Sequence, residues 1–123
     1  MEEKMVEQID VREYSDYLQV IVEGEESLDF ALKYMRRVGD DCKRKGFKKA
    51  LIVADTKGRL SSSDMSSLGG RISQYVRGIK IALVNRQSED YGRQLAEAIS
   101  RASGSDAKSF NGPHQAESWL ARG

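Results

Sequence analysis

The chain has 123 residues, of which 39% are hydrophobic and 32% are charged. This length is typical of a single domain, which we expect to span residues 1–123, and the composition indicates a folded protein rather than a disordered one. No apolar run approaches the roughly 20 residues that a membrane span needs. The single cysteine, Cys42, excludes an internal disulfide, and the acidic N-terminus lacks a signal-peptide pattern, so we expect a cytoplasmic protein.

The net charge of +1 conceals two oppositely charged segments. Residues 1–29 carry ten acidic and two basic side chains, whereas residues 33–49 carry eight basic and two acidic ones. This division could steer a charged partner or let the chain form a homodimer. The alternative, which we favour, is that the two segments neutralise each other within one fold. The weak overall charge argues against nucleic acid as a partner.

The first part of the chain predicts a β-hairpin. Apolar and polar residues alternate over residues 5–13 and again over 17–23, with a short polar turn between the two runs. Strands that alternate in this way have one wet face, as strands near the edge of a sheet do.

Three helices are predicted next, from apolar residues spaced three and four positions apart. Ser27 caps the first helix, which Gly46 ends, and Ser88 caps the third, which Gly104 ends. The second helix is expected over residues 64–75. It contains two adjacent glycines, which suggest either close backbone packing or a helix that loosens.

Two continuous apolar runs, residues 50–54 and 79–84, predict strands that are buried on both faces. A short strand at residues 106–110 and a final helix starting at Pro113 follow. The order ββαβαβαβα predicts an α/β fold with a mixed, mostly parallel sheet of about five strands and four helices. We expect the two apolar runs at the centre of the sheet.

Three segments carry a family resemblance: LIVAD at residues 51–55, KIALV at 80–84 and SFNGPHQAESWLA at 109–121. Together with the order of elements and the length, they resemble the SpoIIAA-like family of small bacterial proteins. This family is a branch of the STAS fold, and its shape is similar to the lipid-binding CRAL-TRIO domain. The resemblance covers nearly the whole chain, but its motifs describe core positions rather than chemistry.

The resemblance implies a non-enzymatic binding or regulatory module. One expectation is that it binds an apolar small molecule or lipid, in a pocket between the sheet and the helices at residues 65–75 and 91–102. The alternative is a partner-switching module that binds a protein, as anti-sigma-factor antagonists do. In those proteins a serine at the start of the second helix is phosphorylated. The corresponding stretch here is DMSSLG at residues 64–69, in which a methionine intrudes and the glycine after the serines is missing.

The candidate switch or ligand site combines the end of a central strand with the start of the second helix. Its members are Asp55, Ser63, Asp64, Ser66 and Ser67. Open α/β sheets form a crevice at the carboxyl ends of their strands, and the free N–H groups of a helix start favour an anion. The structural alternative is that Ser62, Ser63 and Asp64 cap the helix, while Asp55 bonds to the turn that follows it.

We expect neither catalysis nor a bound cofactor or metal. The sequence has no phosphate-binding glycine loop and no nucleophile elbow. His114 is the only histidine, and no cysteine or carboxylate lies at a spacing that would complete a metal site with it. Cys42 lies on the apolar stripe of the first helix, where it is expected to pack rather than react.

Overall fold

The computed structural model describes residues 6–122, and within them the elements follow the predicted order. The strands are β1 (Gln8–Glu13), β2 (Leu18–Glu25), β3 (Lys49–Lys57), β4 (Lys80–Asn85) and β5 (Ala107–Phe110). The helices are α1 (Leu28–Lys45), α2 (Ser62–Val76), α3 (Glu89–Ser103) and α4 (Pro113–Ala121). Residue 5, where the first strand was predicted to begin, lies outside the described residues.

The strands form one five-stranded sheet in the order β1-β2-β3-β4-β5. β1 and β2 make the predicted antiparallel hairpin, in which Val11 lies opposite Val20. The other three neighbouring pairs are parallel. β3 is the central strand and β4 lies beside it, so both apolar runs are interior as predicted. The predicted fold class is confirmed.

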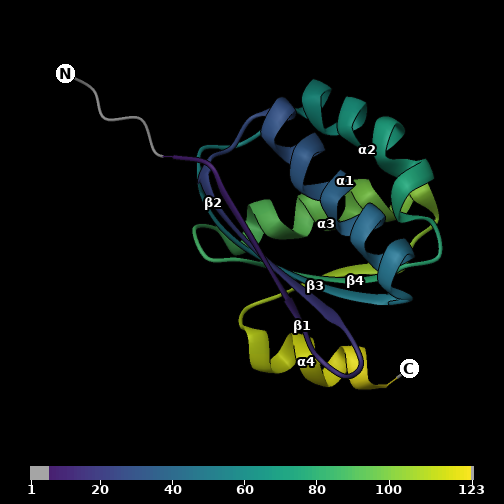
Figure 1. Ribbon diagram of the computed structural model, residues 1–123. Coiled ribbons are helices and arrows are strands. Elements are labelled where there is room, and N and C mark those ends of the chain that lie inside the picture. Colours follow the sequence, from purple (N-terminus) through teal and green to yellow (C-terminus); the bar gives the residue numbers. More distant parts are fainter. Residues whose placement is uncertain (1–5, 123) are drawn as a thin grey trace.

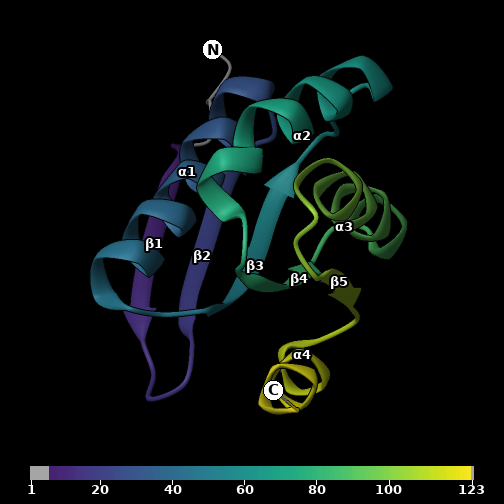
Figure 2. The ribbon, with the colours of Figure 1, turned by 90° about the vertical axis from the view of Figure 1, so that its right-hand side faces the viewer.

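The helices cover the two faces of the sheet unequally. α1, α2 and α3 lie on one face, and α4 lies on the other (Figures 1 and 2). Successive side chains of β3 point to opposite faces of the sheet and so contact both helical layers. Ile52 packs in the core beneath the three helices, whereas Leu51 and Val53 pack against α4. Since α1, α2 and α3 connect β2 to β3, β3 to β4 and β4 to β5, all three crossovers lie on the same side of the sheet.

The predicted caps of α1 and α3 are confirmed. Ser27 and Ser88 each accept a hydrogen bond on Oγ from the backbone N–H three residues later, at 3.1 Å. Gly46 and Gly104 adopt the left-handed conformation that ends these helices. Local signals in the sequence therefore fixed both ends of each helix.

α2 begins two residues before the predicted start. Its cap is Ser61, whose Oγ accepts a hydrogen bond from the backbone N–H of Asp64 at 3.1 Å. The predicted structural alternative placed the capping role on Ser62, Ser63 and Asp64, so it had the right function but the wrong residue.

β3 also extends beyond its apolar run, to Lys57. The connection from β3 to α2 is therefore only residues 58–61. The physical reason is the neighbouring strand: β2 continues to Glu25 and keeps pairing with β3, with Glu25 opposite Lys57. From the sequence alone, polar residues at the end of a strand predict a loop, because the pairing with the neighbouring strand is not known.

Two glycines allow the three helices to pack closely. A Cβ at Gly39 of α1 would collide with the backbone of Tyr75 in α2, and one at Gly69 of α2 would lie 2.8 Å from the Cβ of Ala102 in α3. A Cβ at the adjacent Gly70 would meet nothing within 4 Å. Gly69 is therefore required for close packing against α3, whereas Gly70 leaves the helix backbone exposed to solvent on the outer side of α2.

The acidic N-terminal segment and the basic segment lie next to each other. Ion pairs join Lys33 to Glu7 at 3.2 Å, Lys45 to Glu13 at 3.1 Å and Lys49 to Asp16 at 3.1 Å. These contacts agree with the favoured prediction that the two segments neutralise each other within one fold. Exposed pairs of this kind contribute about 0–1 kcal/mol each, so they reduce the charge asymmetry more than they stabilise the fold.

Candidate functional site

A carboxylate and two tyrosine hydroxyls meet at the carboxyl edge of the sheet. Glu26 follows β2, and its Oε2 accepts hydrogen bonds from the hydroxyls of Tyr34 in α1 and Tyr91 in α3, each at 3.0 Å. The Tyr91 hydroxyl in turn accepts a hydrogen bond from the backbone N–H of Leu60 at 3.1 Å. These four residues, the Glu26 cluster, tie together the end of β2, α1, α3 and the connection that precedes α2.

Burial shifts the ionisation of this cluster. Desolvation raises the pKa of Glu26, and the hydrogen bonds from Tyr34 and Tyr91 offset part of the rise. Burial also raises the pKa of both tyrosines, and the nearby carboxylate adds to the effect. Both hydroxyls therefore keep their protons at neutral pH and act as donors. The second carboxyl oxygen, Oε1, is buried without a hydrogen-bond partner among the described residues.

The carboxyl edge lacks the feature that makes a crevice in open α/β sheets. Such crevices form at a switch point, where the strand order reverses and neighbouring crossovers pass to opposite faces. In this fold α1, α2 and α3 share one face, so β2 to β5 contain no switch point (Figure 2). The physical basis for expecting a ligand crevice at this edge is therefore missing, and the Glu26 cluster lies there instead.

Asp55 lies apart from the other predicted site residues. By the alternation along β3, its side chain is on the α4 side of the sheet with Leu51 and Val53, whereas α2 covers the opposite side. Its Oδ1 accepts a hydrogen bond from Gln87 Nε2 at 2.7 Å. The observed partner of Asp55 is thus the connection between β4 and α3, not the following turn named by the structural alternative.

The four candidates in α2 have different surroundings. Ser63 is exposed, and Asp64 and Ser67 are half-buried. Ser66 is exposed and lines a groove between α2 and α3. The structure therefore separates the five predicted site residues, and only Ser66 lies at a cavity that a ligand or partner could enter.

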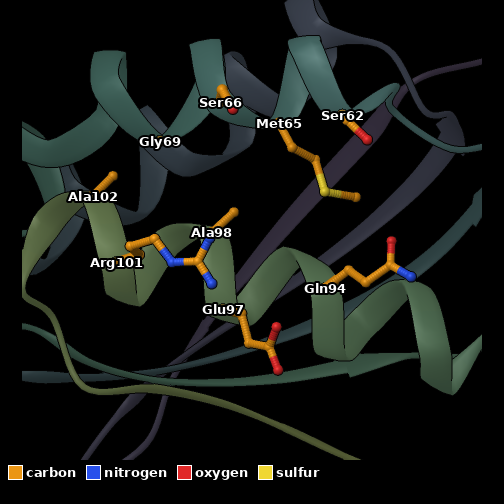
Figure 3. Close-up of a pocket in the computed structure, with 9 residues that line it drawn as sticks. All are labelled: Ser62, Met65, Ser66, Gly69, Gln94, Glu97, Ala98, Arg101 and Ala102. Carbon is orange, nitrogen blue, oxygen red and sulfur yellow. The ribbon is translucent and has the colours of Figure 1, made fainter.

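The groove that contains Ser66, the α2–α3 groove, has a volume of about 360 Å³ (Figure 3). Its lining consists of Ser62, Met65, Ser66 and Gly69 from α2 and Gln94, Glu97, Ala98, Arg101 and Ala102 from α3. Figure 3 shows Met65 reaching from α2 towards α3. Apolar side chains line the middle of the groove, and polar or charged ones frame it.

The position of this groove corrects the predicted position of a ligand pocket. The sequence placed a pocket between the sheet and the second and third helices. Fully buried side chains occupy that space, among them Leu68, Ile72, Leu95 and Ile99. The α2–α3 groove lies between the same two helices but on their solvent side, where most of its lining residues are exposed.

The remaining reactive side chains are explained by packing or exposure. Cys42 is buried in the core, as predicted, and burial raises its pKa to about 11. His114 is exposed in the first turn of α4. Within residues 6–122 no group of three His, Cys, Asp or Glu side chains could hold a metal ion. In the same part of the chain, no helix has both the length and the apolar character to cross a membrane.

The Glu26 cluster was not predicted from the sequence, although the sequence did indicate that Tyr91 would be buried. Tyr91 lies on the apolar stripe of α3, and a buried phenol hydroxyl needs a hydrogen-bond partner. The acceptor could not be identified, because Glu26 is one of ten acidic residues in the N-terminal segment and sits between a strand and a helix cap.

Compared with known proteins, the chain matches no family model and no curated protein.

Proposed function

We propose that the protein is a non-enzymatic module that binds a protein partner through the α2–α3 groove. The groove carries the proposal: Met65, Ala98 and Ala102 form an apolar strip between two exposed helices, framed by polar and charged side chains. An apolar centre with a polar rim is the usual anatomy of a protein-binding surface. Methionine suits such a surface, because its flexible side chain adapts to what it contacts.

The shape of the groove favours a partner's side chains over an enclosed ligand. Its volume of about 360 Å³ is close to the lower limit for small-molecule pockets. Such pockets bury most of their ligand, whereas a groove between two surface helices leaves one side of any occupant in solvent. A side chain projecting from a partner protein needs no such enclosure.

Membership of the SpoIIAA-like branch of the STAS fold is part of this proposal, supported by the resembling segments and the order of elements. It implies partner switching by phosphorylation near the start of α2. Ser66 is the candidate that this geometry favours, because it is exposed and lines the groove. A phosphate on Ser66 would bring about two negative charges into the groove, and so would change its affinity for a partner.

An apolar small molecule or lipid in the same groove is the second candidate function. The observation that favours it is the strip formed by Met65, Ala98 and Ala102, which a short acyl chain could cover. Native mass spectrometry of the protein isolated from its own cells separates the two candidates. A retained small molecule of constant mass would favour this second function.

The proposal is tested by site-specific photo-crosslinking in the source cells. The photo-reactive amino acid p-benzoylphenylalanine replaces Ser66 in one variant and Ser118 in a control, since Ser118 is exposed on α4 at the opposite face. We expect a discrete cross-linked protein from position 66 only, and its loss when Ala102→Glu is added. Identical products from both positions, or none from position 66, would overturn the proposal.

A further inference from the structure

A second groove lies on the other side of α2. This α1–α2 groove has a volume of about 480 Å³ and contains two arginines, Arg36 of α1 and Arg71 of α2. Leu32 and Tyr75 contribute apolar surface beside them. No acidic residue is among the described residues that line it. The groove is therefore positively charged and partly apolar.

The two arginines differ from most basic residues of α1. Four of the six basic residues of that helix form salt bridges with acidic residues: Lys33, Arg37, Arg44 and Lys45. Neither Arg36 nor Arg71 forms a salt bridge with another residue of the described range. Arg36 instead lies over the ring of Tyr75, with 5.3 Å between the guanidinium carbon and the ring centroid. Stacking orients the guanidinium plane and leaves its N–H edge free to bind an anion.

The glycine pair of α2 connects the two grooves. Gly69 lines the α2–α3 groove and Gly70 lines the α1–α2 groove. A Cβ at Gly70 would meet nothing within 4 Å, so the space above the helix backbone is open there. Gly70 is exposed and thus forms a low point on the outer side of α2, whereas Gly69 beside it is buried against α3; we call this pair the glycine saddle. A polypeptide could cross the helix there from one groove to the other.

We propose that an acidic segment of a partner polypeptide crosses α2 at the glycine saddle, with an apolar side chain in the α2–α3 groove and a carboxylate on Arg36 and Arg71. This inference rests on the proposed function and adds the chemistry of the partner. Charge complementarity selects the occupant, because guanidinium groups bind carboxylates through paired, charge-assisted hydrogen bonds. The bare backbone at Gly70 provides the path between the two contacts.

The chemistry of the partner is tested by selecting binders from a random peptide library displayed on phage. The baits are the wild-type protein, the double variant Arg36→Gln/Arg71→Gln and the control Arg77→Gln, which removes an exposed charge directly after α2 and outside both grooves. We expect peptides from the wild type and the control to be enriched in Asp and Glu next to an apolar residue. The double variant should lose the acidic enrichment. Peptides without acidic enrichment, or with the same enrichment on all three baits, would overturn the inference.

Affinities of the most enriched peptide, measured by fluorescence anisotropy, test the geometry. Arg36→Gln or Arg71→Gln should weaken binding at least about tenfold, because each leaves a carboxylate without its donor. Arg36→Lys keeps the charge but not the planar fork, and should weaken binding about threefold or more. Gly70→Leu should block the crossing with a loss of about tenfold and an unchanged circular dichroism spectrum. Equal affinity of the Gly70→Leu variant and the wild type would overturn the crossing at the saddle.

The outcomes separate this inference from the proposed function. If the selected peptides are apolar without acids, and the cross-link from position 66 persists, the inference fails and the proposed function stands. If neither peptides nor a cross-link are obtained, both fail. A wild-type dimer that the double variant Arg36→Gln/Arg71→Gln dissociates would identify a second copy of the chain as the occupant, and would overturn the assignment to a separate acidic partner.

Discussion

The carboxyl edge of the sheet and the outer side of α2 are both rich in polar residues, yet they use them in opposite ways. At the edge, Glu26, Tyr34 and Tyr91 come from three elements, point inwards and bind one another. On α2, Ser62, Ser63 and Ser66 are exposed along one helix, and Ser62 and Ser66 line the α2–α3 groove. Polar residues mark a candidate site only where their hydrogen-bonding capacity remains available to a partner.

The comparison also shows that the location of a ligand crevice depends on which face each crossover covers, and not only on where the parallel strands end. The sequence pointed to the carboxyl edge because parallel strands end there. With three crossovers on one face, that edge has no switch point. The exposed surface of the helical layer carries the two grooves instead. Four predictions would sharpen or break this contrast between a structural edge and an accessible α2.

The largest effect is expected for Glu26→Leu, which removes the acceptor of two tyrosine hydroxyls. We expect the free energy of unfolding to fall by about 3 kcal/mol, because a buried donor without a partner costs about 1–3 kcal/mol. Urea denaturation at pH 7 measures the change. The matched control is Glu26→Gln, whose side-chain oxygen can accept both hydrogen bonds. Equal losses in the two variants would contradict a structural role for this acceptor.

Gly69→Ala should lower the free energy of unfolding by about 1–3 kcal/mol, the usual range for overpacking. The new Cβ would lie 2.8 Å from the Cβ of Ala102 and 3.1 Å from the carbonyl oxygen of Ala98. Adding Ala102→Gly removes the first contact but not the second, and it also costs about 1 kcal/mol of helix propensity in α3. The double variant should therefore be more stable than the sum of the two single losses predicts, and strictly additive losses would show that the helices relax in another way.

The pH dependence of stability should report the half-buried carboxylate of Glu26. The pKa of Glu26 is raised in the folded state, so the folded protein binds this proton more tightly than the unfolded one. Its contribution to stability is fully present below the ordinary glutamate pKa and is lost as the pH rises through the raised pKa. Glu26→Gln does not titrate. The stability of this variant relative to the wild type should therefore increase as the pH rises through that window.

The measurement is urea denaturation of the wild type and of Glu26→Gln at a series of pH values from 4 to 8. The other ionisable groups are common to both proteins, so their contributions cancel in the difference. Asp55→Asn is a suitable control, because Asp55 lies outside the Glu26 cluster and its hydrogen-bond partner is the neutral Gln87. A difference between Glu26→Gln and the wild type that stays constant with pH would contradict the raised pKa.

The smallest effect is expected for Gly70→Ala, which should raise the free energy of unfolding by up to about 1 kcal/mol. Alanine is the better helix former by this amount, and its Cβ would meet nothing within 4 Å. Thermal denaturation measured beside Gly69→Ala gives opposite signs for the two neighbouring glycines. A loss of stability in Gly70→Ala would show that the saddle is filled, and would remove the path proposed for a partner.

Much of the fold was predictable because its signals are local. The apolar runs at residues 50–54 and 79–84 identify interior strands, and Ser27 and Ser88 identify helix starts from their own neighbourhood. The end of β3 was not predictable in the same way. Its last residues are polar, and they are strand only because β2 continues beside them to Glu25.

The candidate site was predictable only in part. The sequence named the start of the second helix, and Ser66 does line a groove there. It could not separate Asp55 from the serines, because the side of the sheet that a strand residue faces depends on which helices cover each face. It also gave no means of associating Arg36 with Arg71, which belong to different helices and line one groove only because α1 packs against α2.

The sequence by itself determined the order of the elements, the interior strands and the caps of α1 and α3, because each depends on residues a few positions apart. Only the tertiary structure decided which polar groups form hydrogen bonds with one another and which remain accessible to a partner. Glu26 and Tyr91 are 65 positions apart and share one part-buried hydrogen bond. Gly69 and Gly70 are neighbours, yet only the first faces Ala102. The pairing of polar groups from distant elements is a property of surfaces brought together by folding, and no local pattern encodes it.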